Sequence, residues 1–282
     1  MPTTSPLPRK PQIIPESDRA IAARLERWHN NFCRSEKQVN GFIALDPVQF
    51  PCRYAEKSGS CKADVEIAAF LAAVIAWGRR DLILRSAEKM FALMDDNPAG
   101  FVMSESYRKL KNRNIHRTFF EGDLKYFCRG FGHCYAKYGS LEKLFAHAPD
   151  IWEGIALFRR EMAAGNGGRI SKHIADPGAA SCGGTSSGAT GCGAGSACKR
   201  INLALRWLVR KGPVDLGLWK SVSPAVLYIP LDVHVARNAR GLGLLRRKAN
   251  DKKAVIELTE KLRKFCPEDP VKYDFALFEN LQ

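Results

Sequence analysis

Residues 65–75 read Val65-Glu66-Ile67-Ala68-Ala69-Phe70-Leu71-Ala72-Ala73-Val74-Ile75, a run that is apolar on nearly every side when it is drawn as a helix. A helix without a polar face is normally buried among other elements. The run therefore predicts a central helix, with Asp64 as its N-cap. We expect this helix to end near Trp77-Gly78, because glycine favours helix termini.

The segments on both sides of this run also have the apolar spacing of helices. Further helices are expected from Ser17 onward, after an N-cap at Asp81, around 123–137, 141–147 and 151–163, and after Asp251. Almost no stretch alternates apolar and polar residues with the period of a half-buried strand. The sequence therefore predicts a mainly α fold.

Composition divides the chain into four parts. Residues 1–16 are rich in Pro, Ser and Thr and predict a flexible lead-in, and residues 17–177 form a helical region. Residues 178–195 are dominated by Gly, Ser, Ala and Thr, which bury too little surface to fold alone, so we expect a mobile loop or linker there. Residues 196–282 form a second helical region.

The chain is strongly basic, with 44 Lys and Arg against 29 Asp and Glu and a formal net charge of +15. Such an excess concentrates polyanions near the surface, and nucleic acid is the simplest partner that it suggests. A generally basic protein without such a partner is the alternative. No apolar run is long enough to cross a membrane, and residues 1–15 lack the apolar core of a signal peptide. We therefore expect a cytoplasmic protein that does not bind membranes.

Nine cysteines are scattered along the chain without a Cys-x-x-Cys pair. A structural zinc site requires close ligand pairs, and an iron–sulfur site requires tight clustering. We therefore expect reduced, half-buried thiols, no metal and no cofactor. Metal or redox chemistry through the cysteines is a third and weaker interpretation, and it would show as stoichiometric zinc or iron in the purified protein.

A basic helix is expected directly after the Gly-rich loop, where the sequence reads Lys199-Arg200-Ile201-Asn202-Leu203-Ala204-Leu205-Arg206-Trp207-Leu208-Val209-Arg210. Its apolar residues predict one buried side. Lys199, Asn202, Arg206 and Arg210 have helical spacing and share another face. We interpret Arg206 and Arg210 as phosphate contacts rather than salt-bridge partners, because no acid lies within one turn of either on this helix.

A short capped helix is expected where the chain reads Ile229-Pro230-Leu231-Asp232-Val233-His234-Val235-Ala236-Arg237-Asn238-Ala239-Arg240-Gly241. Asp232 occupies the N-cap, where backbone N–H groups and the helix dipole favour an ionised carboxylate. Gly241 follows the last turn and ends the helix.

Two of these segments carry a resemblance to a known family. Residues 229–235 resemble the Val-Pro-Val-Asp-x-His-Val signature of the helix-hairpin-helix base-excision DNA glycosylases. Gly195-Ser196-Ala197-Cys198-Lys199 resembles that family's Gly-x-Gly-x-Lys segment, in which a hairpin cradles a DNA phosphate, although Ala197 replaces the second glycine. The segment Gly212–Trp219 is inserted between the two motifs.

The region 195–282 and the piece Ile75-Ala76-Trp77-Gly78-Arg79-Arg80-Asp81 are also similar to a bacterial family known only as a domain of unknown function, a remote relative of these glycosylases. This resemblance implies two helical lobes with a cleft between them. It also implies a location in the bacterial cytosol or nucleoid.

The glycosylase resemblance implies a DNA N-glycosylase, with or without AP lyase activity, that acts on intact or damaged duplex DNA. Such an enzyme flips a nucleotide into a pocket and cleaves its C1′–N bond without a cofactor. Lys199 would be the nucleophile, provided that burial or neighbouring cations leave part of its amine neutral. Asp232 would be the catalytic carboxylate that stabilises the developing positive sugar and accepts a proton.

The resemblance further implies a DNA-contacting surface and a base pocket. The candidates for DNA contact are Gly195, Arg200, Asn202, Arg206, Arg210, Arg79 and Arg80. The base-pocket candidates mix hydrogen-bond donors with aromatic rings: His116, Arg117, Phe119 and His234. Each position also has a structural alternative: a plain N-cap for Asp232, a solvated lysine for Lys199, and ordinary packing for the histidines.

The sequence leaves two functional interpretations. The first is a glycosylase that uses Lys199 and Asp232. The second is a non-catalytic nucleic-acid-binding protein on a glycosylase-like fold, in which the same residues only hold phosphates. The second interpretation predicts an affinity that falls steeply with salt and ignores lesions.

Overall fold

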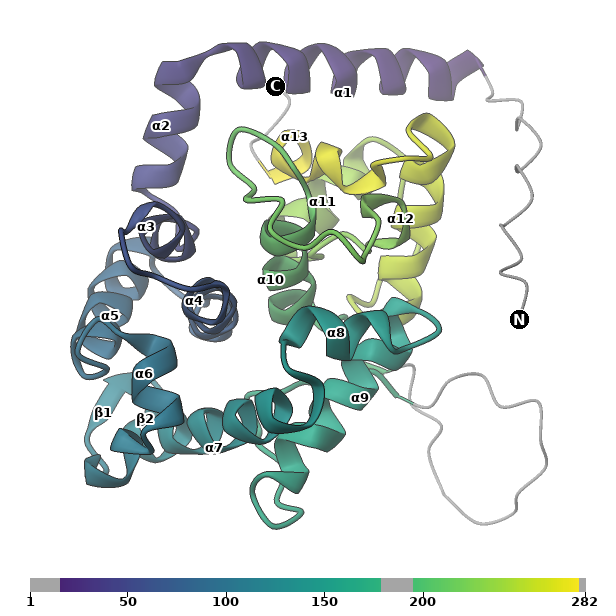
Figure 1. Cartoon of the computed structure of the whole chain (residues 1–282). Helices are drawn as coiled ribbons and strands as arrows, with labels where there is room; N and C mark the ends of the chain where they lie inside the picture. The colour runs from purple at the N-terminus through teal and green to yellow at the C-terminus, as the bar shows by residue number, and fades with distance from the viewer. Residues whose placement is uncertain (1–15, 179–194, 279–282) are drawn as a thin grey trace, which may run out of the picture.

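The computed structural model describes residues 16–178 and 195–278 as a mainly helical protein (Figure 1). Two helices from distant parts of the sequence form its centre, α4 (Lys62–Val74) and α10 (Lys199–Val209). The remaining elements are α1 (Glu16–Arg34), α2 (Glu36–Ala44), α3 (Gln49–Glu56), α5 (Arg80–Ala92), α6 (Pro98–Met103), η1 (Ser106–Lys109), β1 (Asn114–His116), β2 (Phe119–Phe120), α7 (Glu121–Tyr138), α8 (Leu141–Ala146), α9 (Ile151–Ala164), η2 (Pro224–Val226), α11 (Val233–Gly241), α12 (Lys252–Phe265), η3 (Pro270–Tyr273) and α13 (Asp274–Phe278).

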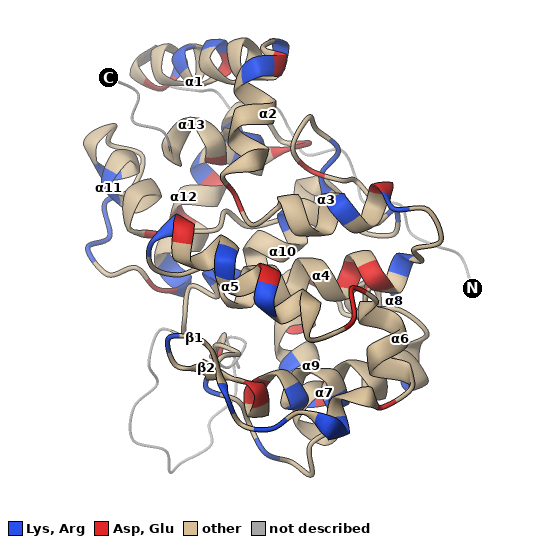
Figure 2. Ribbon diagram, turned by 90° about the vertical axis from the view of Figure 1, so that its left-hand side faces the viewer, with Lys and Arg blue, Asp and Glu red and all other residues tan. Residues whose placement is uncertain are grey.

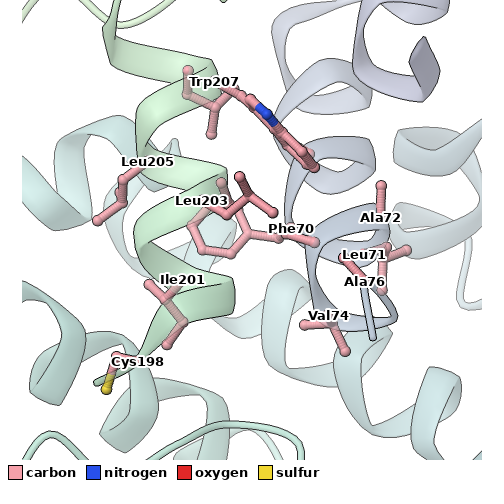
Figure 3. Packing of buried hydrophobic residues seen from close by; sticks show 14 of the residues in the cluster. Phe70, Leu71, Ala72, Val74, Ala76, Cys198, Ile201, Leu203, Leu205 and Trp207 are labelled. Atoms are coloured by element: carbon pink, nitrogen blue, oxygen red, sulfur yellow. The ribbon is translucent and has the colours of Figure 1, made fainter. Parts of the chain in front are cut away.

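Helix α4 is buried on all sides, as its sequence predicts. Every residue from Asp64 to Val74 is buried, and α4 packs directly against α10. Figure 3 shows Leu203 and Trp207 of α10 beside Phe70 of α4. A single apolar cluster joins residues from both helical regions.

The expected start of α4 is wrong. The helix begins at Lys62 with Cys61 as N-cap, and Asp64 is a residue of its first turn. The Asp64 carboxylate accepts hydrogen bonds from the backbone N–H of Cys61 at 2.9 Å and of Ala99 at 2.8 Å. It therefore caps the helix from inside and joins α4 to α6, a use that apolar spacing alone does not reveal.

Glu66 is the polar residue within the central run, and it is fully buried. Its carboxylate accepts hydrogen bonds from Trp219 Nε1 at 2.8 Å, from the Tyr135 hydroxyl at 2.7 Å and from the backbone N–H groups of Leu141 and Glu142 at 3.1 and 3.2 Å. Four donors compensate for much of the cost of burying this group. Glu66 thereby joins α4 to α7, α8 and the loop after α10.

Asp81 is also not the N-cap that we expected. Helix α5 begins at Arg80 after Arg79, and Asp81 lies in its first turn, where a negative charge suits the helix dipole. Its side chain binds Arg79 at 2.9 Å and Arg85 at 3.0 Å.

The other expected helices are present as α1, α7, α8, α9, α11 and α12. The N-caps at Asp232 and Asp251 are confirmed, because each side chain accepts backbone hydrogen bonds from the first turn of its helix. The short helices α2, α3 and α6 and the small hairpin of β1 and β2 are not expected from the sequence. These elements are too short for a periodic pattern to identify.

The N-terminal helices cross the C-terminal end of the chain. Figure 1 shows α1 running above α13, and the two helices are in contact. The Phe275 ring of α13 lies 5.4 Å from the Phe32 ring of α1 and 5.3 Å from the Phe42 ring of α2. Glu26 of α1 binds the Tyr273 hydroxyl at 2.8 Å. These contacts fix the position of α13 beside α10.

Most of the two segments that we expected to be flexible lies outside the described residues, which omit 1–15 and 179–194. Helix α1 begins at Glu16, at the expected end of the lead-in.

Candidate active site

A cavity of about 850 Å³ lies at the N-terminal ends of α10 and α11. Its walls come from eight parts of the chain: the end of α2 with the residues after it, the α4–α5 turn with the start of α5, the β1–β2 turn, residues 172–175, residues 196–206, residues 230–235, Asn250, and α13. This volume is typical of pockets that enclose a small organic ligand. Lys199 and Asp232 both line it, so the structure brings together the two residues predicted for catalysis.

The backbone before α10 is tightly constrained. Gly195 has φ +66°, and a Cβ atom there would lie 2.3 Å from the Pro177 carbonyl oxygen. The Gly195 carbonyl accepts a hydrogen bond from Lys252 N at 3.1 Å, and Ser196 N donates to the Asp176 carbonyl at 2.8 Å. Cys198, with φ +47°, then turns the chain into the helix. Glycine at 195 is thus required by a close backbone approach.

Lys199 is the first residue of α10 and is partly buried. Its amine lies 3.5 Å from the Ala76 carbonyl oxygen, at the outer limit of a hydrogen bond. The neighbouring Arg200 donates to the Val74 carbonyl at 2.9 Å, and its guanidinium lies 5.2 Å from the centre of the Trp77 ring. The N-terminus of α10 therefore places two cations at the C-terminal end of α4, where free carbonyls attract positive charge.

Only one of the two carboxylate oxygens of Asp232 caps α11. Oδ1 accepts both cap hydrogen bonds, from His234 N and Val235 N at 2.9 Å each. The cap therefore does not use Oδ2. Because Asp232 is only partly buried and lines the cavity, this second oxygen is available to a bound molecule.

Two more carboxyl groups line the cavity, on Asp46 and Asp274. Burial raises the pKa of Asp46, and a hydrogen bond from Val48 N at 3.0 Å opposes that shift. Burial and the charge of Asp232 raise the pKa of Asp274 to about 6, while Arg206 and Lys199 act in the opposite direction. The cavity thus combines two lysines, Lys172 and Lys199, with three acids.

Aromatic rings form much of the remaining wall, on Phe42, Trp77, Phe275 and Phe278. Two histidine rings contact Trp77: the His116 ring meets it edge-on at 4.8 Å, and the His173 ring, which also lines the cavity, stacks on it at 5.8 Å. Flat aromatic surfaces of this kind bind nucleobases by stacking.

The predicted phosphate contacts on α10 require correction. Asn202, Arg206 and Arg210 are almost fully buried. Arg206 binds Asp215 at 3.2 Å and also Asp274, and Arg210 binds Asp215 at 2.5 Å. Arg210 also binds Asp269 at 2.8 Å.

The prediction that these two arginines contact phosphate rather than acids is therefore wrong. Their acid partners lie in the loop after α10 and in the C-terminal segment. The prediction considered only acids on the same helix, so it missed them. Asn202 donates to the Ala197 carbonyl at 3.1 Å and braces the turn before α10. Of the predicted DNA contacts, Arg80 and Arg200 line the cavity, and Arg79 is exposed beside it in an ion pair with Asp81.

The base-pocket candidates fall into two groups. His234 lines the cavity, and its ring lies 5.8 Å from that of Phe278. His116 and Phe119 are buried behind the cavity wall. The ring nitrogens of His116 lie 2.9 Å from Ser86 Oγ and from the Trp77 carbonyl oxygen.

Arg117 is exposed, in a left-handed turn with φ +50°, and its guanidinium lies against Gly78. The chain around 115–120 thus supports the wall, and Thr118 is the residue of this turn that lines the cavity.

Sequence reasoning missed several cavity residues, among them Asp46, Trp77, Lys172, Asn250, Asp274 and Phe278. Trp77 belongs to a quoted segment, but nothing in the pattern separates it from a core residue. Cys198 also lines the cavity, and burial raises the pKa of its thiol to about 12. This thiol is therefore protonated near neutral pH and is a poor nucleophile.

The cysteines within the described ranges are all free thiols. No group of three or more His, Cys, Asp and Glu side chains in these ranges has the arrangement of a metal site. Cys182 and Cys192 lie outside them. No helix in the described part of the chain is long and apolar enough to cross a membrane.

The protein is therefore a mainly helical protein with a cavity lined by lysines and acids. A match to a family model places it more narrowly. The chain belongs to the family described as "Protein of unknown function (DUF2400)", whose model matches residues 46–281. The predicted resemblance to a domain of unknown function is thereby confirmed. No curated protein and no solved structure matches the chain.

Proposed function

We propose that this protein is a DNA N-glycosylase that excises a flipped base from duplex DNA, with Lys199 as nucleophile and Asp232 as catalytic carboxylate on a helix-hairpin-helix-like scaffold. The observation that carries the proposal is the shared cavity. The two residues predicted to act together lie far apart in sequence, yet both open onto one space at the N-termini of two helices.

The walls of the cavity suit an extruded nucleotide. Trp77 and Phe278 bring aromatic surface to this space, and aromatic rings bind bases by stacking. Arg80 lies 4.9 Å from the centre of the Phe278 ring and lines the same space, so its charge is available to a phosphate. The N-terminus of α10, which has no side-chain cap, adds partial positive charge that favours an anion. Removing the base from the stack is required because the C1′ atom is otherwise inaccessible.

Lys199 and Asp232 would divide the chemistry between them. The neutral amine of Lys199 attacks C1′, and a Schiff base follows when the sugar ring opens. Oδ2 of Asp232 stabilises the positive charge that develops on the sugar and accepts a proton from the attacking amine. The cap hydrogen bonds to Oδ1 hold the carboxylate in place and leave Oδ2 for this step.

Lys199 also has a structural role, which the test must separate from catalysis. Its ammonium group lies near the free carbonyls of α4, so Lys199→Ala removes a helix-end contact as well as an amine. Lys199→Arg keeps a cation at this position but cannot form a Schiff base. A matched control is Arg200→Lys, which keeps the charge beside the same helix end.

The experiment is single-turnover excision from duplexes that each carry one oxidised, alkylated or deaminated base. We expect wild-type protein to excise at least one of these bases, Lys199→Arg to lose Schiff-base formation, and Arg200→Lys to retain it. Absence of excision across the set, together with salt-dependent binding that ignores the lesion, would instead establish the non-catalytic nucleic-acid-binding protein.

A further inference from the structure

The cavity contains a carboxyl group that the two motifs do not account for. Asp274, the first residue of α13, is 5% exposed and lines the cavity. Its Oδ2 accepts a hydrogen bond from Arg206 Nη1. No donor or acceptor within the described residues reaches its other oxygen, Oδ1, although this atom is buried.

An unpaired buried carboxyl oxygen is costly, so a bound group that shares a proton with it would stabilise the site. The ion pairs of Asp215 and Asp269 provide the contrast. Asp215 binds Arg206 and Arg210, and Asp269 binds Arg210. Neither acid lines the cavity, and neither has a buried oxygen without a partner. Asp274 is therefore the acid of this group that both lines the cavity and has a carboxyl oxygen without a partner.

We propose that Asp274 is a second catalytic residue of this site, the general acid that donates a proton through Oδ1 to the departing base, while Asp232 serves the sugar. This inference rests on the proposed glycosylase function. It assigns the ligand of Asp274 to a class, a nucleobase whose ring nitrogen or carbonyl oxygen accepts a hydrogen bond. It also separates the tasks of two carboxyls that share one cavity.

The bond from C1′ to the base nitrogen breaks, and its electron pair passes to the base, which takes the proton from Oδ1 of Asp274. The neutral amine of Lys199 forms the new bond to C1′ and becomes cationic. Asp274 is left as a carboxylate beside Arg206, whose guanidinium already contacts Oδ2 and stabilises the charge that forms.

The surroundings of Asp274 allow it to hold a proton near neutral pH. Burial raises its pKa to about 6, and Asp232 of the α11 N-cap adds to this shift. Arg206 and Lys199, both on α10, favour the ionised form. From the remaining neighbours of α13, Glu26 of α1 is neutralised by Lys272 of η3 at 2.9 Å, and His234 of α11 contacts the Phe278 ring. Enclosure of a base would remove water and favour the protonated form further.

The test compares two reactions of the full-length protein, because only one of them has a leaving base. Duplexes with an abasic site form a Schiff base with Lys199 without any proton donor for a base, whereas damaged-base duplexes require one. We expect Asp274→Asn to lower base excision by about 10²-fold or more and to trap abasic duplexes with borohydride at close to the wild-type rate. Asp232→Asn should impair both reactions.

Asp215→Asn is the structural control, since Asp215 binds Arg206, the arginine that pairs with Asp274, but does not itself line the cavity. We expect it to lower stability and to keep the wild-type ratio of excision to trapping. The pH profile is a further measurement: wild-type excision should decline as pH rises above about 6, and the Asp274→Asn profile should lack this limb.

The outcomes separate the two proposals. If the wild-type protein neither excises a base nor traps an abasic duplex, the proposed function fails. If the wild type does both and Asp274→Asn keeps its excision rate and pH limb, the function stands and the role of Asp274 is wrong. Wild-type trapping without excision of any tested base also overturns the role, because no base then departs.

Discussion

Asp232 caps α11 and also lines the cavity. Asparagine is about as good an N-cap as aspartate, so Asp232→Asn should preserve α11 and change the free energy of unfolding by less than about 1 kcal/mol. Excision should nevertheless fall by about 10²-fold or more, because the amide carries no negative charge to stabilise the sugar cation.

The control for this prediction is Asp150→Asn. Asp150 caps α9 through Glu153 N at 2.8 Å but does not line the cavity. Thermal unfolding and single-turnover excision would be measured for both variants. Equal excision by Asp232→Asn and the wild type would show that Asp232 is only a helix cap.

Asp274 should make stability depend on pH in a defined direction. Its pKa is raised to about 6 in the folded protein, from a model-compound value of 3.8. The stabilisation linked to its proton is fully present below the unfolded-state pKa and is lost as pH rises through about 6. The wild type should therefore lose about 2–3 kcal/mol relative to Asp274→Asn between pH 4 and pH 7.

Urea unfolding of the two proteins at several pH values would measure this difference. A free-energy difference that stays constant between pH 4 and pH 7 would contradict the raised pKa. The measurement is independent of any DNA substrate and so tests the environment of Asp274 alone.

At the residue scale, the sequence identified the cavity pair but not its neighbours. Lys199 and Asp232 each belong to a recognisable sequence motif, and both line the cavity. Asp46 and Asp274 carry none, because their roles come from long-range packing that places α2 and α13 beside α10. The failure at Arg206 and Arg210 has the same cause, since their acid partners are distant in sequence or lie beyond the helix end.

The turn before α10 determines where Lys199 points. Gly195→Ala should place a Cβ atom 2.3 Å from the Pro177 carbonyl oxygen, so the turn must shift. Gly167 is a matched control, because its φ of +64° is similar but a Cβ atom there has no neighbour within 4 Å. Gly167→Ala should cost about 1 kcal/mol from backbone strain alone.

We expect Gly195→Ala to destabilise the protein more than Gly167→Ala and to reduce Schiff-base formation as well. Thermal unfolding and abasic-duplex trapping would be compared for both variants. If the two variants behave alike, the close approach of Gly195 and Pro177 does not control the position of Lys199.

At the scale of elements, long periodic helices were predictable and short elements were not. The apolar run of α4 and the capped starts of α11 and α12 follow from spacing and N-cap chemistry. The short hairpin of β1 and β2 follows from no sequence pattern. It nevertheless contributes Thr118 to the cavity and His116 to the support of Trp77. The order of elements along the chain also does not reveal that α1 covers α13.

The whole molecule carries positive charge near the cavity as well as within it. Figure 2 shows Lys and Arg on α11 and in the chain that follows it, whereas α1 carries both signs of charge. Arg240 holds this following loop by donating to the carbonyls of Arg247 and Lys248 at 2.9 Å and to Asn250, which lines the cavity. Arg246 and Lys248 in the loop are exposed.

If DNA crosses the cavity, these loop cations should contact its phosphates. Arg246→Gln and Lys248→Gln should each weaken duplex binding for all sequences and reduce the slope of log affinity against log salt by about 1. Arg160→Gln, at an exposed position on α9, is the control and should leave the slope unchanged. Equal slopes in all three variants would place the DNA elsewhere.

The most direct test of the account is to identify the lysine that reacts. Abasic duplex would be trapped with borohydride on the wild-type protein, and the modified peptide would be mapped by mass spectrometry. The shared cavity of Lys199 and Asp232 predicts a single adduct on Lys199. An adduct on Lys172, the other lysine of the cavity wall, or the absence of any adduct would contradict the assignment of Lys199 as the nucleophile.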